Sequence, residues 1–243
     1  MRVLLAVVAL LAAAGPPVHS GRNTLGRGGG ALRGTTIAVD PGHNGANWAH
    51  PSQIDRLVDA GGFRKACDTT GTATPDGISE AWYVFDVAQR LARILRAEGA
   101  RVVLTRTTND GVGPCIDERA AIGNRAHADA AISIHGDGGP SSGRGFDVIY
   151  RPHDAAAHRL ALAIRSAFRA GTGEPYATYV GRDGLDVRTD LGGLNLSTVP
   201  KVLIETLNMR NPADAKLVES ARFRQREAAA LARGLEAFLH ARP

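Results

Sequence analysis

Residues 36–45 read TIAVDPGHNG, and the first half of this stretch predicts a strand of a buried sheet. Its residues up to Val39 are mostly β-branched and apolar, as in strands that are covered on both faces. Pro41 cannot continue a central strand, and Gly42 permits a turn. His43 therefore lies just beyond the C-terminal end of a strand, the edge at which open α/β sheets bind ligands. A single histidine there is weak evidence, so the other strand ends decide whether it has partners.

Strand and helix patterns alternate along the rest of the chain. Apolar runs predict strands at 36–40, 101–106, 130–134, 145–150 and 200–205, and apolar stripes at helical spacing predict helices at 80–98, 116–126, 154–170 and 221–240. The strand at 145–150 alternates apolar and polar residues, which favours the edge of the sheet. The segments 44–78 and 171–199 are rich in turn residues and are predicted to be loops. This order predicts one α/β sandwich with mostly parallel strands.

The N-terminal residues follow the order of a secretory signal peptide. An apolar run of 12 residues, Val3 to Ala14, is broken by Gly15-Pro16-Pro17 and followed by small or neutral residues up to Ser20. We therefore expect a signal peptide at 1–20, with an uncleaved membrane anchor as the alternative. The glycine-rich residues 21–34 are expected to be a flexible lead-in, and 35–241 the folded domain. The mature protein is expected to have no stable membrane insertion.

Composition limits which binding partners and which cellular compartment we expect for this chain. The formal net charge is +5, which suits an anionic polymer such as a cell wall. No basic run or patch interleaved with aromatic residues supports nucleic acid binding. Cys67 and Cys115 are the only cysteines, and they lack the close spacing of a metal pair. An oxidising compartment would let them form a disulfide, while two free thiols remain the alternative.

Four side chains form the candidate site. The predicted topology brings His43, His135 and Glu205 to the C-terminal ends of three strands. Glu80 falls in the first turn of a helix, on the side that faces the core. Two imidazoles and a carboxylate are a ligand set of catalytic zinc sites, and a second carboxylate can move a proton. The chain has no H-E-x-x-H motif, and histidines at strand ends also serve as hydrogen-bonding loop residues. The residues alone leave both interpretations open.

In the order in which they occur, four motifs resemble the zinc-dependent N-acetylmuramoyl-L-alanine amidases of the amidase-3 class. They are Val39-Asp40-Pro41-Gly42-His43, Glu80 opening a helix, Ser133-Ile134-His135, and Pro200 through Glu205 followed by Asn208 and Asn211. The resemblance covers residues 35–240. It implies a three-layer α/β sandwich with a mostly parallel twisted sheet and helices on both faces.

The resemblance also implies roles for single residues. His43, Glu80 and His135 would bind one Zn²⁺ per chain, and Glu205 would be the catalytic glutamate. The candidates for contacts to the ligands or to substrate are Asp40, Asn44, Asp137 and Asn208. Asp40 and Asp137, which flank the two histidines, could orient the imidazole rings or merely cap turns.

The chain departs from the family pattern beside two of these residues. After the catalytic glutamate the family commonly has any one residue, then Gly and then Phe, whereas this chain has Thr206, Leu207 and Asn208. Gly136 stands where the family usually has Ala. The implied ligands are intact, but substrate contacts beside Glu205 are left open.

The expected function is that of a secreted, monomeric zinc hydrolase in the periplasm or cell wall. It would cleave the amide between N-acetylmuramic acid and L-alanine in peptidoglycan or in muropeptide fragments. The long loop after His43 would form a wall of the substrate groove. The alternatives are a zinc carboxypeptidase or deacetylase acting on another bond, and a non-catalytic peptidoglycan-binding module. Retention of all four site residues argues against the binding module.

Overall fold

The computed structural model describes residues 30–241. The predicted signal peptide at 1–20 and most of the predicted lead-in lie outside the described residues. Residues 31–34 form turns, Leu32 is buried in the main core, and its N–H donates to the carbonyl of Glu98 over 2.9 Å. The packed domain therefore begins a few residues before the expected boundary at residue 35. Among the described residues, none of the helices has the length and apolarity needed to span a membrane.

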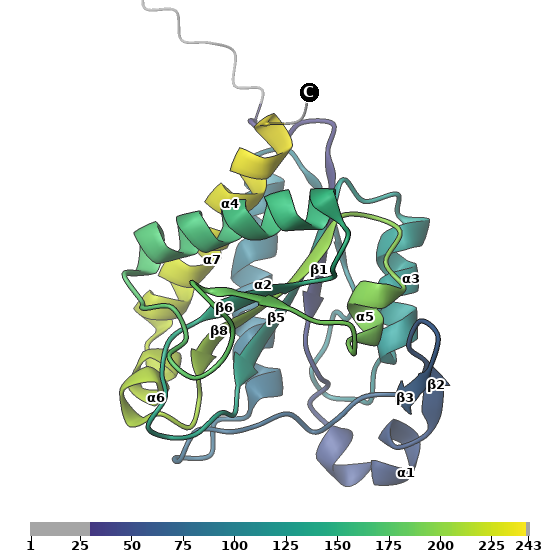
Figure 1. The fold of residues 1–243 in the computed structure, drawn as a ribbon, viewed down its shortest axis with the longest axis vertical. Helices are drawn as coiled ribbons and strands as arrows, with labels where there is room; N and C mark the ends of the chain where they lie inside the picture. Colours follow the sequence, from purple (N-terminus) through teal and green to yellow (C-terminus); the bar gives the residue numbers. More distant parts are fainter. Residues whose placement is uncertain (1–29, 242–243) are drawn as a thin grey trace, which may run out of the picture.

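A six-stranded sheet with the order β4-β1-β5-β8-β6-β7 forms the centre of the domain (Figure 1). The strands are β1 (Thr36–Pro41), β4 (Arg101–Leu104), β5 (Ala130–Asp137), β6 (Asp147–Tyr150), β7 (Leu185–Val187) and β8 (Lys201–Asn208). All neighbouring strands are parallel except β6 and β8. The mostly parallel α/β fold is confirmed.

The predicted edge position of the strand at 145–150 is wrong. β6 pairs with β8 on one side and with β7 on the other, so β7 is the edge strand. β7 lies in the segment predicted to be a loop. Its three residues are too few to give an alternating pattern in the sequence.

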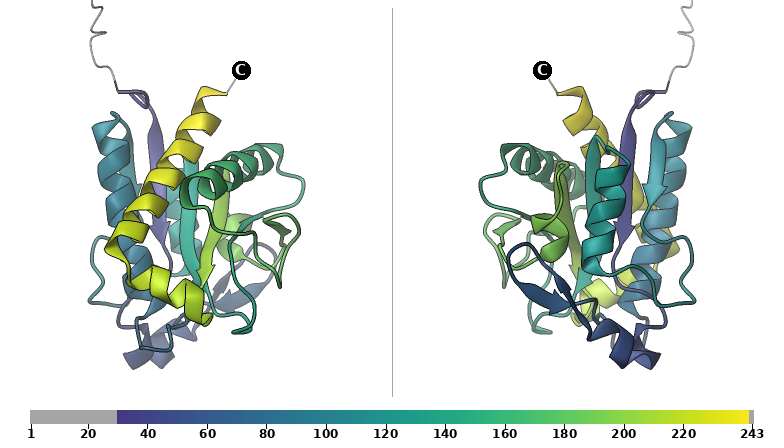
Figure 2. Two further views of the ribbon diagram at one scale, coloured as in Figure 1. Left: turned by 90° about the vertical axis from the view of Figure 1, so that its left-hand side faces the viewer. Right: turned by 90° about the vertical axis from the view of Figure 1, so that its right-hand side faces the viewer.

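Helices cover both faces of the sheet (Figure 2). On one face α7 (Ala221–His240) packs against both α2 (Glu80–Ala97) and α4 (Ala155–Thr172). On the other face α3 (Ile116–Arg125) contacts β1 and α5 (Gly192–Asn195) contacts β8. Alternation along β1 separates the two faces, since Ile37 and Val39 join the core under α2 whereas Ala38 faces α3. Gly123 of α3 faces Ala38 of β1, since a Cβ at Gly123 would lie in ordinary contact with the Ala38 side chain, at 3.5 Å.

The long connection after His43 contains short elements that the sequence pattern did not predict. They are the 3₁₀ turn η1 (Asn47–Ala49), α1 (Pro51–Ile54) and the antiparallel hairpin of β2 (Leu57–Asp59) and β3 (Arg64–Ala66). A disulfide between Cys67 and Cys115 ties this hairpin to the start of α3, so the alternative of free thiols is wrong. Val58 and Ile116 pack around the disulfide.

The short helix α5 lies in the segment 171–199 that was predicted to be a loop, and the helix α6 (Pro212–Glu219) was also missing from the predicted elements. The start of α6 has ordinary signals, with Asn211 accepting hydrogen bonds from two backbone N–H groups as the N-cap and Pro212 in the first helical position. The helix is eight residues long, so its apolar pattern covers only two turns.

Candidate metal and active site

The strand ends place three of the predicted site residues on one side of the sheet. His43 follows β1 with a left-handed backbone, φ 54°, which brings its imidazole back over the sheet edge. His135 and Glu205 lie within β5 and β8 rather than after them, directly opposite each other in the register. They alternate with Ile134 and Ile204, which face α2 and α7, so both side chains project to the side of α3 and α5.

Gly42 is required by the close approach of His135. A Cβ at Gly42 would collide with the imidazole ring of His135. The Gly42 N–H donates to the carbonyl of Ile134 over 2.9 Å, which extends the pairing of β1 with β5 up to the site. The glycine before His43 therefore lets the two imidazoles stand next to each other, with ring centroids 4.9 Å apart.

Glu80 enters the site from the N-terminus of α2. The hydroxyl of Ser79 caps this helix by accepting from the Trp82 N–H. Glu80 is buried at 4% exposure, and its two oxygens accept hydrogen bonds from the N–H groups of Thr72 and Gly136. Glu80 therefore points inward, as the sequence predicts, and these two N–H groups hold its carboxylate next to the histidines.

His43, Glu80 and His135 form one cluster of potential metal ligands. Oε1 of Glu80 lies 3.1 Å from Nε2 of His43 and 2.9 Å from Nδ1 of His135. All three donor atoms lie within 4.8 Å of one another. Two imidazoles and one carboxylate beside an open cavity match the donor set of a catalytic zinc site. The residues present therefore fit a divalent zinc ion.

The electrostatics of this cluster are those of a site that attracts a cation. Burial alone would lower the pKa of His43, but the carboxylates of Glu80 and Asp68 outweigh it and raise that pKa to about 10. Burial alone would raise the pKa of Glu80, but the two histidines outweigh it and hold that pKa below its usual range. Without a cation, the carboxylate is thus compensated by a proton on an imidazole.

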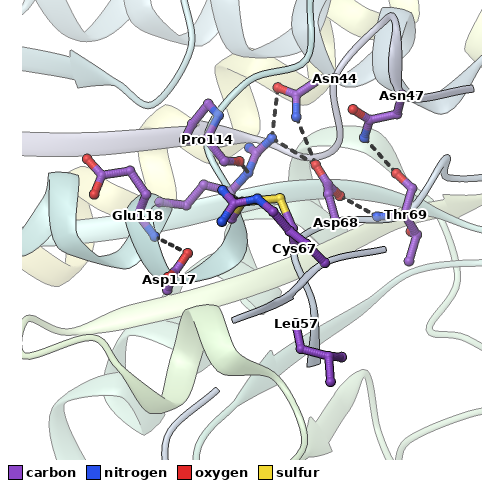
Figure 3. The surroundings of a disulfide bond; sticks show 12 residues. Asn44, Asn47, Leu57, Cys67, Asp68, Thr69, Pro114, Asp117 and Glu118 are labelled. Atoms are coloured by element: carbon purple, nitrogen blue, oxygen red, sulfur yellow. Dashed lines mark hydrogen bonds and ion pairs between the residues drawn. A yellow bond between two sulfur atoms is a disulfide. The ribbon is translucent and has the colours of Figure 1, made fainter. Parts of the chain in front are cut away.

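Asp68 supports His43 from the side opposite Glu80. Nδ1 of His43 lies 3.1 Å from Oδ1 of Asp68 and 3.0 Å from the carbonyl oxygen of Thr69. These acceptors fix the proton on Nδ1 and leave Nε2 free to face Glu80. Figure 3 shows the Asp68 carboxylate between the side chain of Asn44 and the backbone of Thr69. Sequence reasoning missed Asp68, although it adjoins Cys67 and so lies in a segment that a disulfide would fix.

Asp40 and Asn44, two of the predicted candidates, form hydrogen bonds in the interior of the domain next to the site. Asp40 is buried, and its carboxylate oxygens accept from four groups: Thr105, Ser133, Arg119 and Lys201. Burial by itself would raise the pKa of Asp40, but Lys201 and Arg119 outweigh it and hold that pKa well below its usual value. Asn44 donates to Asp68 over 2.9 Å and accepts from Arg119. Neither residue is hydrogen-bonded to an imidazole in the described part of the chain.

The two remaining candidates have different places. Asp137 lines the cavity above the site, and its Oδ1 accepts from the Gly138 N–H. Asn208 is fully buried and donates to the carbonyls of Pro140 and Gly143, so it holds the loop after β5 rather than lining the cavity.

The departures from the family pattern beside Glu205 also face away from the cavity. Thr206 is hydrogen-bonded to Tyr83, and its hydroxyl donates to the carbonyl of His135. Leu207 belongs to the core under α2 and α7. These residues therefore contribute to packing.

Glu205 lies in the same cavity as the three ligand candidates but outside their cluster. Its Oε2 is buried and has no hydrogen-bond partner among the described residues. Burial raises the pKa of Glu205 well above its usual value, and the nearby carboxylates of Glu80, Asp137 and Asp147 raise it further. Asp147 pairs with Glu205 in the register of β6 and β8 and is itself buried. Glu205 is thus a carboxyl group that binds a proton readily.

The cavity has a volume of about 400 Å³ and two kinds of wall. Ile149, Leu194 and Leu203 make an apolar side, and the half-exposed Lys65 and Arg188 stand at the rim. Asp190 pairs with both cations, which leaves one net positive charge at this rim. The cavity therefore suits a ligand that carries both apolar groups and carboxylates.

Comparisons with known proteins agree on one family. Residues 37–237 match the family profile Amidase_3, described as N-acetylmuramoyl-L-alanine amidase. The chain is 42% identical over 240 residues to "N-acetylmuramoyl-L-alanine amidase Rv3717" of Mycobacterium tuberculosis. The aligned region covers 96% of this chain and 97% of that protein. The crystal structure of the amidase Ami1 from Mycobacterium smegmatis matches with a TM-score of 0.83 and 42% identity, covering 87% and 99% of the two chains. Ami1 from Mycobacterium abscessus matches with a TM-score of 0.82 and 40% identity, covering 86% and 100%.

Proposed function

Because this chain belongs to the Amidase_3 family of N-acetylmuramoyl-L-alanine amidases, we propose that it hydrolyses the amide between N-acetylmuramic acid and L-alanine in peptidoglycan. The observation that carries the proposal is the cluster of His43, Glu80 and His135 with Glu205 in the same cavity. A non-catalytic binding module would have no need of these four polar side chains, two of them buried, around one cavity.

His43, Glu80 and His135 would hold a single Zn²⁺ through Nε2, Oε1 and Nδ1. When bound in such a site, zinc lowers the pKa of water toward 7 and polarises a carbonyl group. The N–H groups of Thr72 and Gly136 keep the Glu80 carboxylate in place, and Asp68 fixes the tautomer of His43. The chain thus supplies a pre-arranged donor set rather than one formed on binding.

Glu205 performs the proton transfer in this proposal. Its carboxylate accepts a proton from the attacking water and then delivers it to the nitrogen of L-alanine, which leaves as a free amine. Burial and the nearby carboxylates of Glu80, Asp137 and Asp147 raise the pKa of Glu205, so its carboxylate accepts a proton more readily than an ordinary one. Lys65 and Arg188 attract the carboxylates of the stem peptide at the rim of the cavity.

We also propose that the chain acts outside the cytoplasm, at the cell wall or in the periplasm, as a monomeric single domain. The signal-peptide pattern of residues 1–20 and the Cys67–Cys115 disulfide support this location, since disulfides persist in oxidising compartments.

Mass analysis of purified muropeptides tests the reaction. We expect the protein to release intact stem peptides with a free L-alanine amine from the sugar, and a chelator to stop this release until zinc is restored. Loss of a C-terminal D-alanine would indicate a carboxypeptidase, and loss of an acetyl group a deacetylase. An unchanged digest with full binding to cell walls would indicate a binding module.

A further inference from the structure

Trp48 is an exposed aromatic side chain on a rigid support. It is 77% exposed, more than any other large apolar side chain described. The residue before it, Asn47, is buried and donates from its side chain to the carbonyl of Thr69 over 2.7 Å. The N–H of Ala46 donates to the carbonyl of Gly111. The turn η1 is therefore fixed on both sides, and it holds the indole out into solvent.

The indole borders a second hollow beside the proposed active site. Trp48, Asn44, Ser79, Ala81 and Arg210 line this hollow together with residues 70–72. Residues 70–72 line both this hollow and the main cavity, so they form a strap between the two. Asn44 and Ala81 adjoin the ligand candidates His43 and Glu80 in the chain. The second hollow thus lies directly across the strap from the metal site.

The two hollows differ in chemistry. The main cavity has apolar walls and cations at its rim, whereas the second hollow is lined by hydroxyl groups, an amide, an exposed arginine and the indole. Arg210 is anchored to the strap, because its Nε donates to the hydroxyl of Thr72 over 3.3 Å. An aromatic face beside hydroxyl groups and a guanidinium suits the ring of a sugar, which offers C–H groups on one face and hydroxyls at its edge.

We propose that the second hollow binds the glycan strand of peptidoglycan, with the Trp48 indole stacked on an N-acetylhexosamine ring. The proposal rests on the proposed function, because the bond to be cut joins a neutral sugar to a charged peptide. A site for that bond therefore needs one binding surface for the sugar and another for the peptide. The main cavity has an apolar wall and cations at its rim for the peptide, and the Trp48 hollow has the aromatic face and the hydroxyl groups for the sugar.

Trp82 provides a matched control. It is 43% exposed and lies close to the site in sequence, two residues after Glu80, but it does not line either hollow. The guanidinium of Arg224 already covers its ring at 4.8 Å from the centroid. No cation is stacked on Trp48 among residues 30–241. The two indoles, which are the only ones in the chain, therefore differ in whether a face is available to a sugar.

Binding to purified cell walls tests the proposal without turnover, in a Glu205→Ala background. We expect Trp48→Ala to weaken binding by about three- to tenfold, and Trp48→Phe to retain most of it, because a smaller aromatic face remains. Trp82→Ala should bind as the parent does. Equal binding by the Trp48→Ala and Trp82→Ala proteins would overturn the proposal. Circular dichroism melting of each variant shows that it is folded.

An N-acetylglucosamine tetramer tests the ligand class separately from the reaction, because it carries no stem peptide. In a Trp82→Phe protein, Trp48 is the single tryptophan, and we expect the tetramer to shift and quench its fluorescence saturably. Absence of any change up to millimolar tetramer would overturn glycan binding, even if the amidase reaction is established. A saturable change in a protein that releases no stem peptides would instead refute the proposed reaction and leave the glycan site standing.

Discussion

Oδ1 of Asp68 lies 3.1 Å from Nδ1 of His43, across the imidazole ring from the Glu80 carboxylate. Arg119 holds Asp68 in turn, with Nη2 lying 3.4 Å from Oδ2, and the same guanidinium donates to the carbonyl of His43 over 2.7 Å. The disulfide partner Cys67 precedes Asp68 in the chain, and Cys115 occupies the N-cap position of the helix that carries Arg119. The orientation of one ligand candidate therefore depends on contacts made by two distant segments.

Asp68→Asn should weaken zinc binding by about 10- to 100-fold, the usual effect of removing a partner that orients a metal-binding histidine. The amide can still accept a hydrogen bond, but it lacks the charge that supports the imidazole. Competition with a zinc-binding dye measures the affinity. Asp55→Asn, an exposed change in the same loop, is the control and should leave the affinity unchanged. Equal affinities for the two variants would contradict the role assigned to Asp68.

Glu205→Gln should separate metal binding from turnover. Glu205 lies outside the cluster of ligand candidates, so we expect zinc affinity to stay within about threefold of the parent. The amide cannot accept and return a proton, and turnover of muropeptides should fall by about 10²- to 10⁴-fold. Metal content after dialysis and the rate of stem-peptide release are the two measurements. A variant that keeps its full rate would exclude Glu205 as the proton carrier.

Replacing Cys67 and Cys115 together by Ser should lower stability and zinc affinity at once. The disulfide joins residues 48 apart, and in the chain-entropy model a loop of that length stabilises the fold by about 4 kcal/mol. For a domain of this size the melting temperature should fall by about 10 °C. Calorimetry with and without zinc checks both effects. If the variant bound zinc as the parent does, the placement of Asp68 would not depend on the disulfide.

Glu227→Gln should stabilise the domain at neutral and higher pH. Burial raises the pKa of Glu227 to about 8, against the lowering effects of Tyr83 and Arg224, and Glu174 raises it further. Because this pKa exceeds the unfolded value near 4.5, the contribution of the protonated carboxyl is full below about pH 4.5 and is lost as the pH rises to about 8. The amide removes this loss and can still accept the hydrogen bond from Tyr83.

The expected gain from Glu227→Gln at pH 7 is roughly 1–3 kcal/mol. Denaturant unfolding between pH 4 and 9 measures it, with the exposed Glu219→Gln as the control. A stability difference that did not grow with pH would contradict the raised pKa.

The sequence allowed the main strands, the long helices and the convergence of four side chains on one sheet edge to be predicted. The reason is that these features follow from local patterns, such as the apolar run that ends at Asp40 and the helical stripe after Ser79. Asp68 and the pairing of β7 could not be predicted, because each depends on tertiary contacts of a short irregular segment. The role of Asp40 could not be predicted for the same reason. An acidic residue close to a histidine in the sequence can either orient the imidazole of a metal ligand or form hydrogen bonds in the interior of the domain.

Side chains along β8 alternate between the two faces of the sheet, and this alternation decides where residues can be inserted into the chain without displacing Glu205. Leu203 and Glu205 line the cavity, while Val202 and Ile204 face the helices on the other side. Inserting one residue between Lys201 and Glu205 would reverse this phase, turning the carboxylate into the apolar core and an isoleucine into the cavity. Insertions in the connection between α4 and β7 leave the phase intact. Relatives or engineered forms that keep the activity should therefore vary in length at such connections and never within β8.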